Sequence, residues 1–220
     1  MRPSAVFRLT LPVSLAIIFV SASFANAQDA PPPFPRVVVD LRVSVLKFPG
    51  DFEVAAARQL DQRELPGVGL GIDGGAQLYL FKWGAVTVGG GLQLTLARSR
   101  SSPLAAAGEA PLRSVTERFS AVAPQLSLNF GTGDGWSYLS GGIGRSAWSI
   151  VPDKGTARPA DRERLYTINY GGGARWFLTP HMAFTFDARF YARAPGTPHL
   201  DAPGTPRTTL LLMGAGISVK

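Results

Sequence analysis

Apolar and polar residues alternate along most of this chain, and that period of two constrains its fold more than any other feature. In the segment 37–45 valine and leucine occupy the odd positions, and Asp40, Arg42 and Ser44 lie between them. Successive side chains of a strand point to opposite faces, so the pattern predicts a strand with one apolar and one polar face. Seven further segments are expected to form strands: 67–81, 85–98, 118–130, 136–150, 165–178, 182–193 and 208–219.

The connections between these segments alternate between long and short. The long ones are 49–66, 99–117, 151–164 and 194–207, and the short ones are 82–84, 131–135 and 179–181. A barrel of an outer membrane has tight turns on its periplasmic side and longer loops outside. The sequence therefore predicts an all-β fold, an eight-stranded antiparallel up-and-down transmembrane β-barrel formed by residues 36–220.

The composition of the polar face indicates where it points. It consists of glycine, threonine, serine, asparagine and glutamine with few charges, and lysine occurs only four times in the chain. Eight strands enclose a lumen that side chains can fill. We therefore expect the polar face inside and the apolar face against lipid. In segment 136–150 the alternation does not decide which side chains face lipid. Leu139 and Ile143 favour one face, and Trp136 and Tyr138 favour the other.

Three acids and three arginines fall on the predicted inward face. Buried charges are costly unless they are paired and hydrogen-bonded, so we predict a lumenal salt-bridge network. The network could be a gated polar path or a plug that holds the strands in register, and the narrow lumen favours the plug. Its predicted members are Asp40, Arg42, Asp73, Arg175, Asp187 and Arg189.

Aromatic residues flank the three short connections. Amphipathic rings prefer the boundary between membrane and water, so these residues are expected to form an aromatic girdle. The alternative is that they are ordinary core aromatics. The predicted girdle consists of Phe81, Trp83, Phe130, Trp136, Trp176 and Phe177.

The N-terminal residues have the features of an export signal. Arg2 and Arg8 accompany an apolar stretch at 9–23, and Ala25-Asn26-Ala27 forms a small-residue cleavage site. This pattern predicts a signal peptide at 1–27, whereas a membrane anchor is disfavoured because Pro12 interrupts the apolar run. Residues 28–35 are rich in proline and predict an extended periplasmic spacer. We expect the exported chain to reach the outer membrane.

Three segments resemble a known family: PGVGLGIDGGAQLYLF, SYLSGGIGRSAW and NYGGGARWFLTPHMAFTFDARFYAR. They are similar to small outer-membrane β-barrels, which include eight-stranded proteins of the outer-membrane protein A and X type. The resemblance implies a monomer in a Gram-negative outer membrane, with roles in envelope integrity, surface adhesion or resistance. It also implies assembly by the barrel-assembly machinery, which commonly reads an aromatic C-terminal residue. This chain departs from that pattern and ends Ile217-Ser218-Val219-Lys220.

The sequence contains little that indicates catalysis. It has no cysteine, and its glycine runs neither open a helix nor precede Lys-Ser or Lys-Thr, as a phosphate loop requires. His181 and His199 lack partners at metal-ligand spacing, so we expect no metal site. We also expect that the protein is not an enzyme and binds no cofactor. Two alternatives remain. A barrel enzyme acting on lipid A would need a histidine and a serine at its lipid-facing edge, and a lipocalin-like binder would be soluble in the periplasm.

The predicted outer loops contain most of the remaining positive charge. Arginine matches the geometry of phosphate, so outer-membrane lipid and the phosphates of lipopolysaccharide are the expected partners. A solvated loop face is the other interpretation. Nucleic acid is not expected, because no basic and aromatic platform is present. The candidate lipopolysaccharide contacts are Arg98, Arg100, Lys154, Arg158, Arg162 and Arg164.

Overall fold

The computed structural model describes residues 34–105, 107–199 and 203–220. The predicted signal peptide at 1–27 and most of the predicted spacer lie outside this part of the chain. Phe34, near the end of that spacer, packs against Tyr79 and Trp136 with ring centroids 5.4 and 4.7 Å apart.

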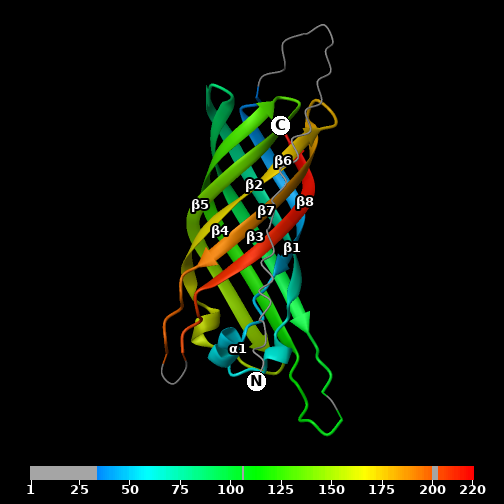
Figure 1. Cartoon of the computed structure of the whole chain (residues 1–220), viewed down its shortest axis with the longest axis vertical. Coiled ribbons are helices and arrows are strands. Elements are labelled where there is room, and N and C mark those ends of the chain that lie inside the picture. The colour runs from blue at the N-terminus through cyan, green and yellow to red at the C-terminus, as the bar shows by residue number, and fades with distance from the viewer. Residues whose placement is uncertain (1–33, 106, 200–202) are drawn as a thin grey trace, which may run out of the picture. The chain divides into compact units, whose positions relative to one another are not determined.

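The described chain forms a closed antiparallel barrel (Figure 1). Each strand pairs with the next one in sequence, and pairing between the first and the last closes the cylinder. Closure leaves no unpaired sheet edge. The eight-stranded all-β prediction is thereby confirmed. The strands are β1 Val37–Lys47, β2 Val68–Trp83, β3 Val86–Ser101, β4 Val115–Thr132, β5 Gly135–Pro152, β6 Arg164–Phe177, β7 Met182–Arg193 and β8 Thr208–Val219.

The short and long connections lie at opposite ends of the barrel, here named the turn end and the loop end (Figure 1). The first long connection contains helix α1, Phe52–Arg58, and a 3-10 turn, η1, Gln62–Glu64. The third contains a further 3-10 turn, η2, Pro159–Asp161. The sequence had not predicted these helical segments. None of the helices in the described ranges is both long and apolar enough to cross a membrane.

A local cap explains how α1 begins. The backbone N–H of Val54 donates to Asp51 Oδ1 over 2.9 Å, which satisfies one of the free amides of the first turn. The helix ends at Gln59, whose φ of 54° places it in the left-handed region. Val54 and Ala55 are buried against the loop end of the barrel interior. This helix therefore covers the interior at that end.

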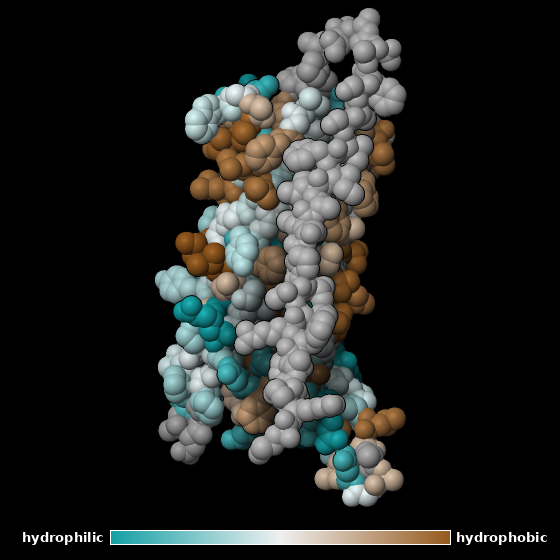
Figure 2. Space-filling model, in the orientation of Figure 1, coloured by the Kyte–Doolittle hydropathy of each residue, from teal (hydrophilic) through white to brown (hydrophobic). Residues whose placement is uncertain are grey.

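The two faces of the strands separate as the alternation predicts. In β1, Asp40, Arg42 and Ser44 are buried, whereas Val43 on the opposite face is 67% exposed. In β5, Leu139 and Ile143 point outward and Tyr138 points inward, which decides the face that the sequence had left open. Apolar side chains gather on the outer wall, above a more polar loop end (Figure 2).

The interior has an apolar cluster at each end. At the turn end, Val38, Tyr79, Trp136 and Tyr138 pack together. A larger cluster at the loop end joins barrel residues such as Leu46, Phe119, Trp148 and Leu210 to α1. The polar residues described in the next subsection complete the filling of the lumen.

Two members of the predicted girdle lie inside the barrel instead. Trp136 is buried, and Phe177 is partly buried against the same turn-end cluster. Trp176 and Phe177 are neighbours in one strand, so their side chains must point to opposite faces of the sheet. They cannot both belong to the aromatic girdle on the outer wall. Trp136 lies opposite Arg175, which also points inward. The remaining four are exposed on the outside: Phe81, Trp83, Phe130 and Trp176.

Candidate functional site: the lumenal charge network

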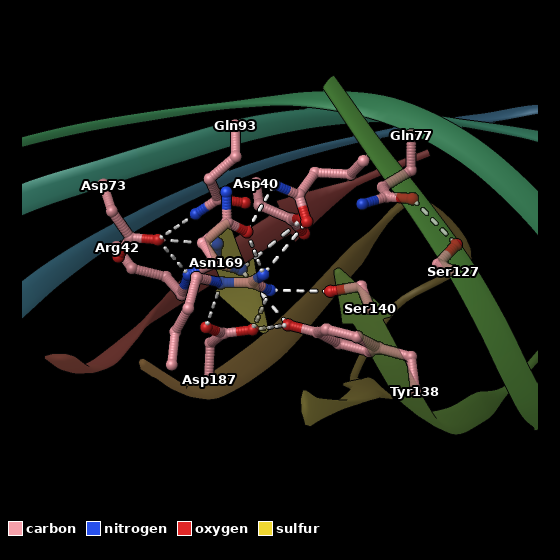
Figure 3. A network of polar contacts seen from close by, with 12 residues as sticks. Asp40, Arg42, Asp73, Gln77, Gln93, Ser127, Tyr138, Ser140, Asn169 and Asp187 are labelled. Carbon is pink, nitrogen blue, oxygen red and sulfur yellow. Dashed lines mark hydrogen bonds and ion pairs between the residues drawn. The ribbon is translucent and has the colours of Figure 1, made fainter. Parts of the chain in front are cut away.

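The structure buries all six charged residues of the predicted lumenal set. Each is at most 3% exposed, and they come from four strands: β1, β2, β6 and β7. Figure 3 shows how most of them meet in the lumen. Three carboxylates and three guanidinium groups share this space, so their formal charges balance. The six residues are Asp40, Arg42, Asp73, Arg175, Asp187 and Arg189.

Asp73 on β2 is held by its neighbours on β1 and β3. Arg42 donates to Asp73 Oδ2 from Nε over 2.8 Å and from Nη2 over 2.6 Å. Gln93 donates to the same oxygen over 2.8 Å. Charge-assisted hydrogen bonds of this kind are about twice as strong as neutral ones. They join three adjacent strands through their inward side chains.

Asp40 on β1 is paired across the lumen. Arg175 Nε on β6 donates to Asp40 Oδ1 over 2.9 Å, although β6 is not a neighbour of β1. Ser218 Oγ on β8 donates to the same oxygen over 2.5 Å. Arg42 Nη1 lies 3.5 Å from Asp40 Oδ2. Asp40 thus links the Asp73 group to the opposite wall.

Asp187 on β7 is the acceptor of a third group. Tyr138 donates its hydroxyl hydrogen to Asp187 Oδ2 over 2.7 Å. Arg189 donates to both carboxylate oxygens over 3.1 Å, and it also donates to Ser140 Oγ over 2.7 Å. Arg189 Nη1 reaches Gln125 and Asn169 over 3.0 and 3.1 Å. Strands β4 to β7 are connected through this one guanidinium.

Tyr138 connects the three groups. Arg42 Nη1 on β1 lies 3.5 Å from the hydroxyl of Tyr138 on β5, and these two strands face each other in the closed order. The guanidinium of Arg175 stacks over the Tyr138 ring at 4.2 Å from its centroid. Side chains from opposite strands therefore meet across the lumen.

The close approach of Tyr138 requires a glycine on the neighbouring strand. A Cβ at Gly173 would lie 2.7 Å from the Tyr138 hydroxyl and 1.9 Å from the carbonyl oxygen of Phe186. Both separations are far shorter than carbon contacts allow. Gly173 thus makes room for the ring that links the network.

The sequence interpretation named the charged members but missed the neutral ones. The sequence predicts glutamine and asparagine on the polar face, but it does not identify Gln93, Gln125 and Asn169 as partners of the charges. Tyr138 was missed because the alternation in its segment was ambiguous. The inward series Trp136, Tyr138 and Ser140 in steps of two could have revealed it.

A second set of buried charges lies at the loop end and joins loops to one another. Arg58 of α1 places Nη1 2.9 Å from Asp161 Oδ1 and donates from Nη2 to Thr205 Oγ1 over 3.0 Å. Burial lowers the pKa of Arg58 from its ordinary value, although Asp161 opposes that shift. Glu117 of β4 is fully buried, and within the described residues its carboxylate oxygens accept no hydrogen bond.

Glu64 and Arg113 connect the first two loops. Arg113 donates to Glu64 from its backbone N–H over 2.6 Å and from Nη2 over 2.9 Å. The Glu64 side chain is only 4% exposed. Hydrogen bonds from Arg113 hold the pKa of Glu64 below its ordinary value. Ion pairs and hydrogen bonds thus join the loops to one another at this end of the barrel.

The candidate lipopolysaccharide contacts do not form one cluster. Arg100 is paired with Asp153, and Arg158 donates to Gln59 over 2.9 Å. Lys154 and Arg162 are exposed in the third loop. Arg98 and Arg164 lie exposed on β3 and β6.

Neither histidine is placed on a strand wall. His181 lies in the turn before β7, and His199 lies exposed in the loop before β8. The described residues contain no group of histidine, aspartate and glutamate side chains that could hold a metal ion.

Comparison with solved structures gives the fold independently. Neisserial surface protein A matches 84% of this chain over 97% of its own length, with a TM-score of 0.50 and 10% identity. This chain shares the fold of that protein. The outer membrane protein OprG of Pseudomonas aeruginosa matches with 9% identity and a TM-score of 0.46, over 87% of this chain and 98% of its own. Ail of Yersinia pestis matches with 16% identity and a TM-score of 0.38, over 83% and 95%.

The expected resemblance to small eight-stranded barrels is therefore confirmed at the level of fold. No protein-family model matches the sequence, and no curated protein matches it. The fold places the network inside a closed cylinder but does not by itself assign it a role.

Proposed function

We propose that this protein is a non-enzymatic surface protein of the outer membrane, whose closed barrel supports a fixed loop end. In this proposal the barrel contributes to envelope integrity or contacts other molecules through its loops, and it does not transport solutes. The observation that carries the proposal is the contact between Arg42 and Tyr138 across the lumen. Water and ions have no open path through a lumen that is filled in this way.

The outer wall supports a membrane location. Leu70 is 70% exposed and Leu126 is 71% exposed, and similar aliphatic side chains surround the barrel. Water-soluble proteins rarely expose apolar patches of this extent. Lipid accepts such a surface if the backbone groups are already paired, and a closed barrel meets that condition. Among membranes, outer membranes are where single-chain barrels of this kind occur.

The loop end supports a role at the surface. Its first loop is anchored to the third and fourth loops by Arg58, and to the second loop by Glu64 and Arg113. A surface held in one arrangement can bind a partner at a lower entropic cost than mobile loops can. The positions of His181 and His199 do not favour the alternative enzyme, because neither lies within a strand of the barrel wall.

Conductance and gel mobility together test this proposal. The purified chain is refolded into phospholipid vesicles, and its gel mobility is compared with and without boiling. We expect the unboiled protein to migrate as a compact species, and we expect planar bilayers containing it to show no stable conductance steps. A protein that remains in solution without detergent, or one that forms a steady channel, would contradict the proposal.

A further inference from the structure

Two arginines face each other on the outer wall near the loop end. Arg98 of β3 and Arg118 of β4 are direct cross-strand partners, and both are exposed. No described acidic residue pairs with either side chain. Like charges directly opposite one another destabilise a sheet. An anion bound between them would remove that repulsion.

The register continues this basic site across the next two strands. Arg118 lies opposite Ser149 of β5. In the adjacent row, Ser120 lies opposite Ala147, which in turn lies opposite Arg164 of β6. Ser120, Ala147 and Ser149 have short side chains, so no bulky group separates the Arg98–Arg118 pair from Arg164 in this part of the register, here called the floor.

Arg145 adds a fourth guanidinium close to this floor. It stacks over Tyr166 at 3.8 Å and donates to the carbonyl oxygen of Arg164 over 3.1 Å. This leaves its side chain beside Arg164 on the outer face. The wall thus presents two separated pairs of arginines.

An apolar groove of about 600 Å³ adjoins the first pair. Leu70, Ile72 and Leu96 line it together with Arg98 and Arg118. Leu70 lies directly opposite Arg98, and Ile72 lies opposite Leu96. One acidic residue, Asp161, also lines the groove. Its oxygens already accept from the backbone N–H groups of Ile150 and Arg158 and pair with Arg58, so the free charge of the groove is positive.

The position of the groove suits an amphiphile. Leu96 belongs to the apolar wall, and Arg98 lies two residues closer to the loops on the same face of β3. A bound lipid would therefore place its acyl chain along Leu70 and Ile72 and its anionic group at the arginines. Guanidinium groups bind phosphate through paired hydrogen bonds.

We propose that this groove binds lipid A, with one acyl chain against Leu70 and Ile72 and a phosphate between Arg98 and Arg118. Lipid A is favoured over a phospholipid because each sugar of its disaccharide can carry a phosphate, which matches two separated arginine pairs. The second phosphate lies at Arg164 and Arg145. This inference rests on the proposed function, since it needs the wall to face the outer leaflet.

Native mass spectrometry of the folded chain in a nonionic detergent tests the inference. The ligands are lipid A, lipid A without its phosphates, and phosphatidylglycerol. The test variant is Arg98→Gln/Arg118→Gln. The control is Arg36→Gln/Arg207→Gln, which removes the same charge from exposed positions outside the groove. We expect the test variant to bind lipid A at least about tenfold more weakly, which corresponds to about 1.4 kcal/mol, and the control to bind as the unaltered chain does.

The outcomes separate this inference from the proposed function. Equal binding of lipid A by the test variant and the unaltered chain would overturn the inference. Phosphatidylglycerol binding as tightly as lipid A would also overturn it and would assign the groove to phospholipid. Equally tight binding of the dephosphorylated lipid would overturn it too, because the arginines would then not contribute to binding. Both variants must still insert into phospholipid vesicles with unchanged gel mobility. If the unaltered chain fails to insert, the proposed function fails instead.

Discussion

Asp187 is the carboxylate on which the third group of the lumenal network depends. It accepts hydrogen bonds from Tyr138 and from two nitrogens of Arg189. Its removal leaves a buried guanidinium without its counter-charge, and removal of one partner of a buried pair costs about 3–5 kcal/mol. We expect Asp187→Ala to lower the free energy of unfolding by that amount, measured by urea titration in vesicles.

The control for this variant is Asp153→Ala. Asp153 pairs with Arg100 at the exposed loop end, where an ion pair contributes at most about 1 kcal/mol. Asp187→Ala should also remain closed in planar bilayers, because Arg42, Tyr138 and Arg189 still occupy the lumen. A large stable pore in this variant would show that the network is a gate, not a plug.

Gly173 offers a steric test of the same network. A Cβ there would lie 1.9 Å from the Phe186 carbonyl oxygen and would press on Tyr138. We expect Gly173→Ala to destabilise the barrel by about 1–3 kcal/mol, the usual cost of overpacking. Gly67→Ala is the matched control, because a Cβ at Gly67 meets no atom within 4 Å. Equal stability of the two variants would mean that neither the Phe186 carbonyl nor Tyr138 lies as close to Gly173 as the structure places it.

At the scale of the elements, the alternation predicted the strands better than their ends. β4 begins at Val115, three residues before the predicted start, and therefore includes Glu117. Near the loops, β4 has polar residues on both faces, so the alternation of apolar and polar residues cannot be recognised there although the strand continues. Helix α1 could not be predicted by pattern, because its seven residues are stabilised by the Asp51 cap and by burial of Val54 and Ala55. Burial of that kind depends on the barrel beneath it.

The pKa of Glu64 predicts how the loop end responds to acid. Because hydrogen bonds from Arg113 lower this pKa in the folded protein, they stabilise the loop contact above the ordinary value of about 4.3. That stability is lost as the pH falls through the lowered pKa. We expect hydrogen-exchange protection of residues 48–67 to decline as the pH falls below the ordinary pKa of glutamate, while the strands stay protected.

The variant Glu64→Gln isolates the effect of this carboxylate. It cannot titrate at position 64, so protection of residues 48–67 should be weaker at neutral pH and should change less on acidification. An identical pH dependence in the variant and the unaltered chain would show that other groups control the loops.

At the scale of the whole molecule, closure determines which residues meet. The alternation placed Asp40 and Arg175 on inward faces, yet they are 135 positions apart in sequence. Their pairing depends on the stagger of all strands, which is set when β1 pairs with β8. No local pattern contains that stagger. The sequence named Arg98 as a loop residue that could contact lipopolysaccharide, but it did not predict that Arg98 pairs with Arg118 on the outer wall.

The central claim is that the aliphatic face meets hydrocarbon while the charged face is enclosed. The chain has no cysteine, so a single nitroxide label can be attached at Ile72→Cys without other changes. Ile72 is 51% exposed on the outer wall. In vesicles we predict that molecular oxygen relaxes this label more strongly than a water-soluble nickel chelate does. Stronger relaxation by the nickel chelate would place the aliphatic wall in water and would contradict the claim.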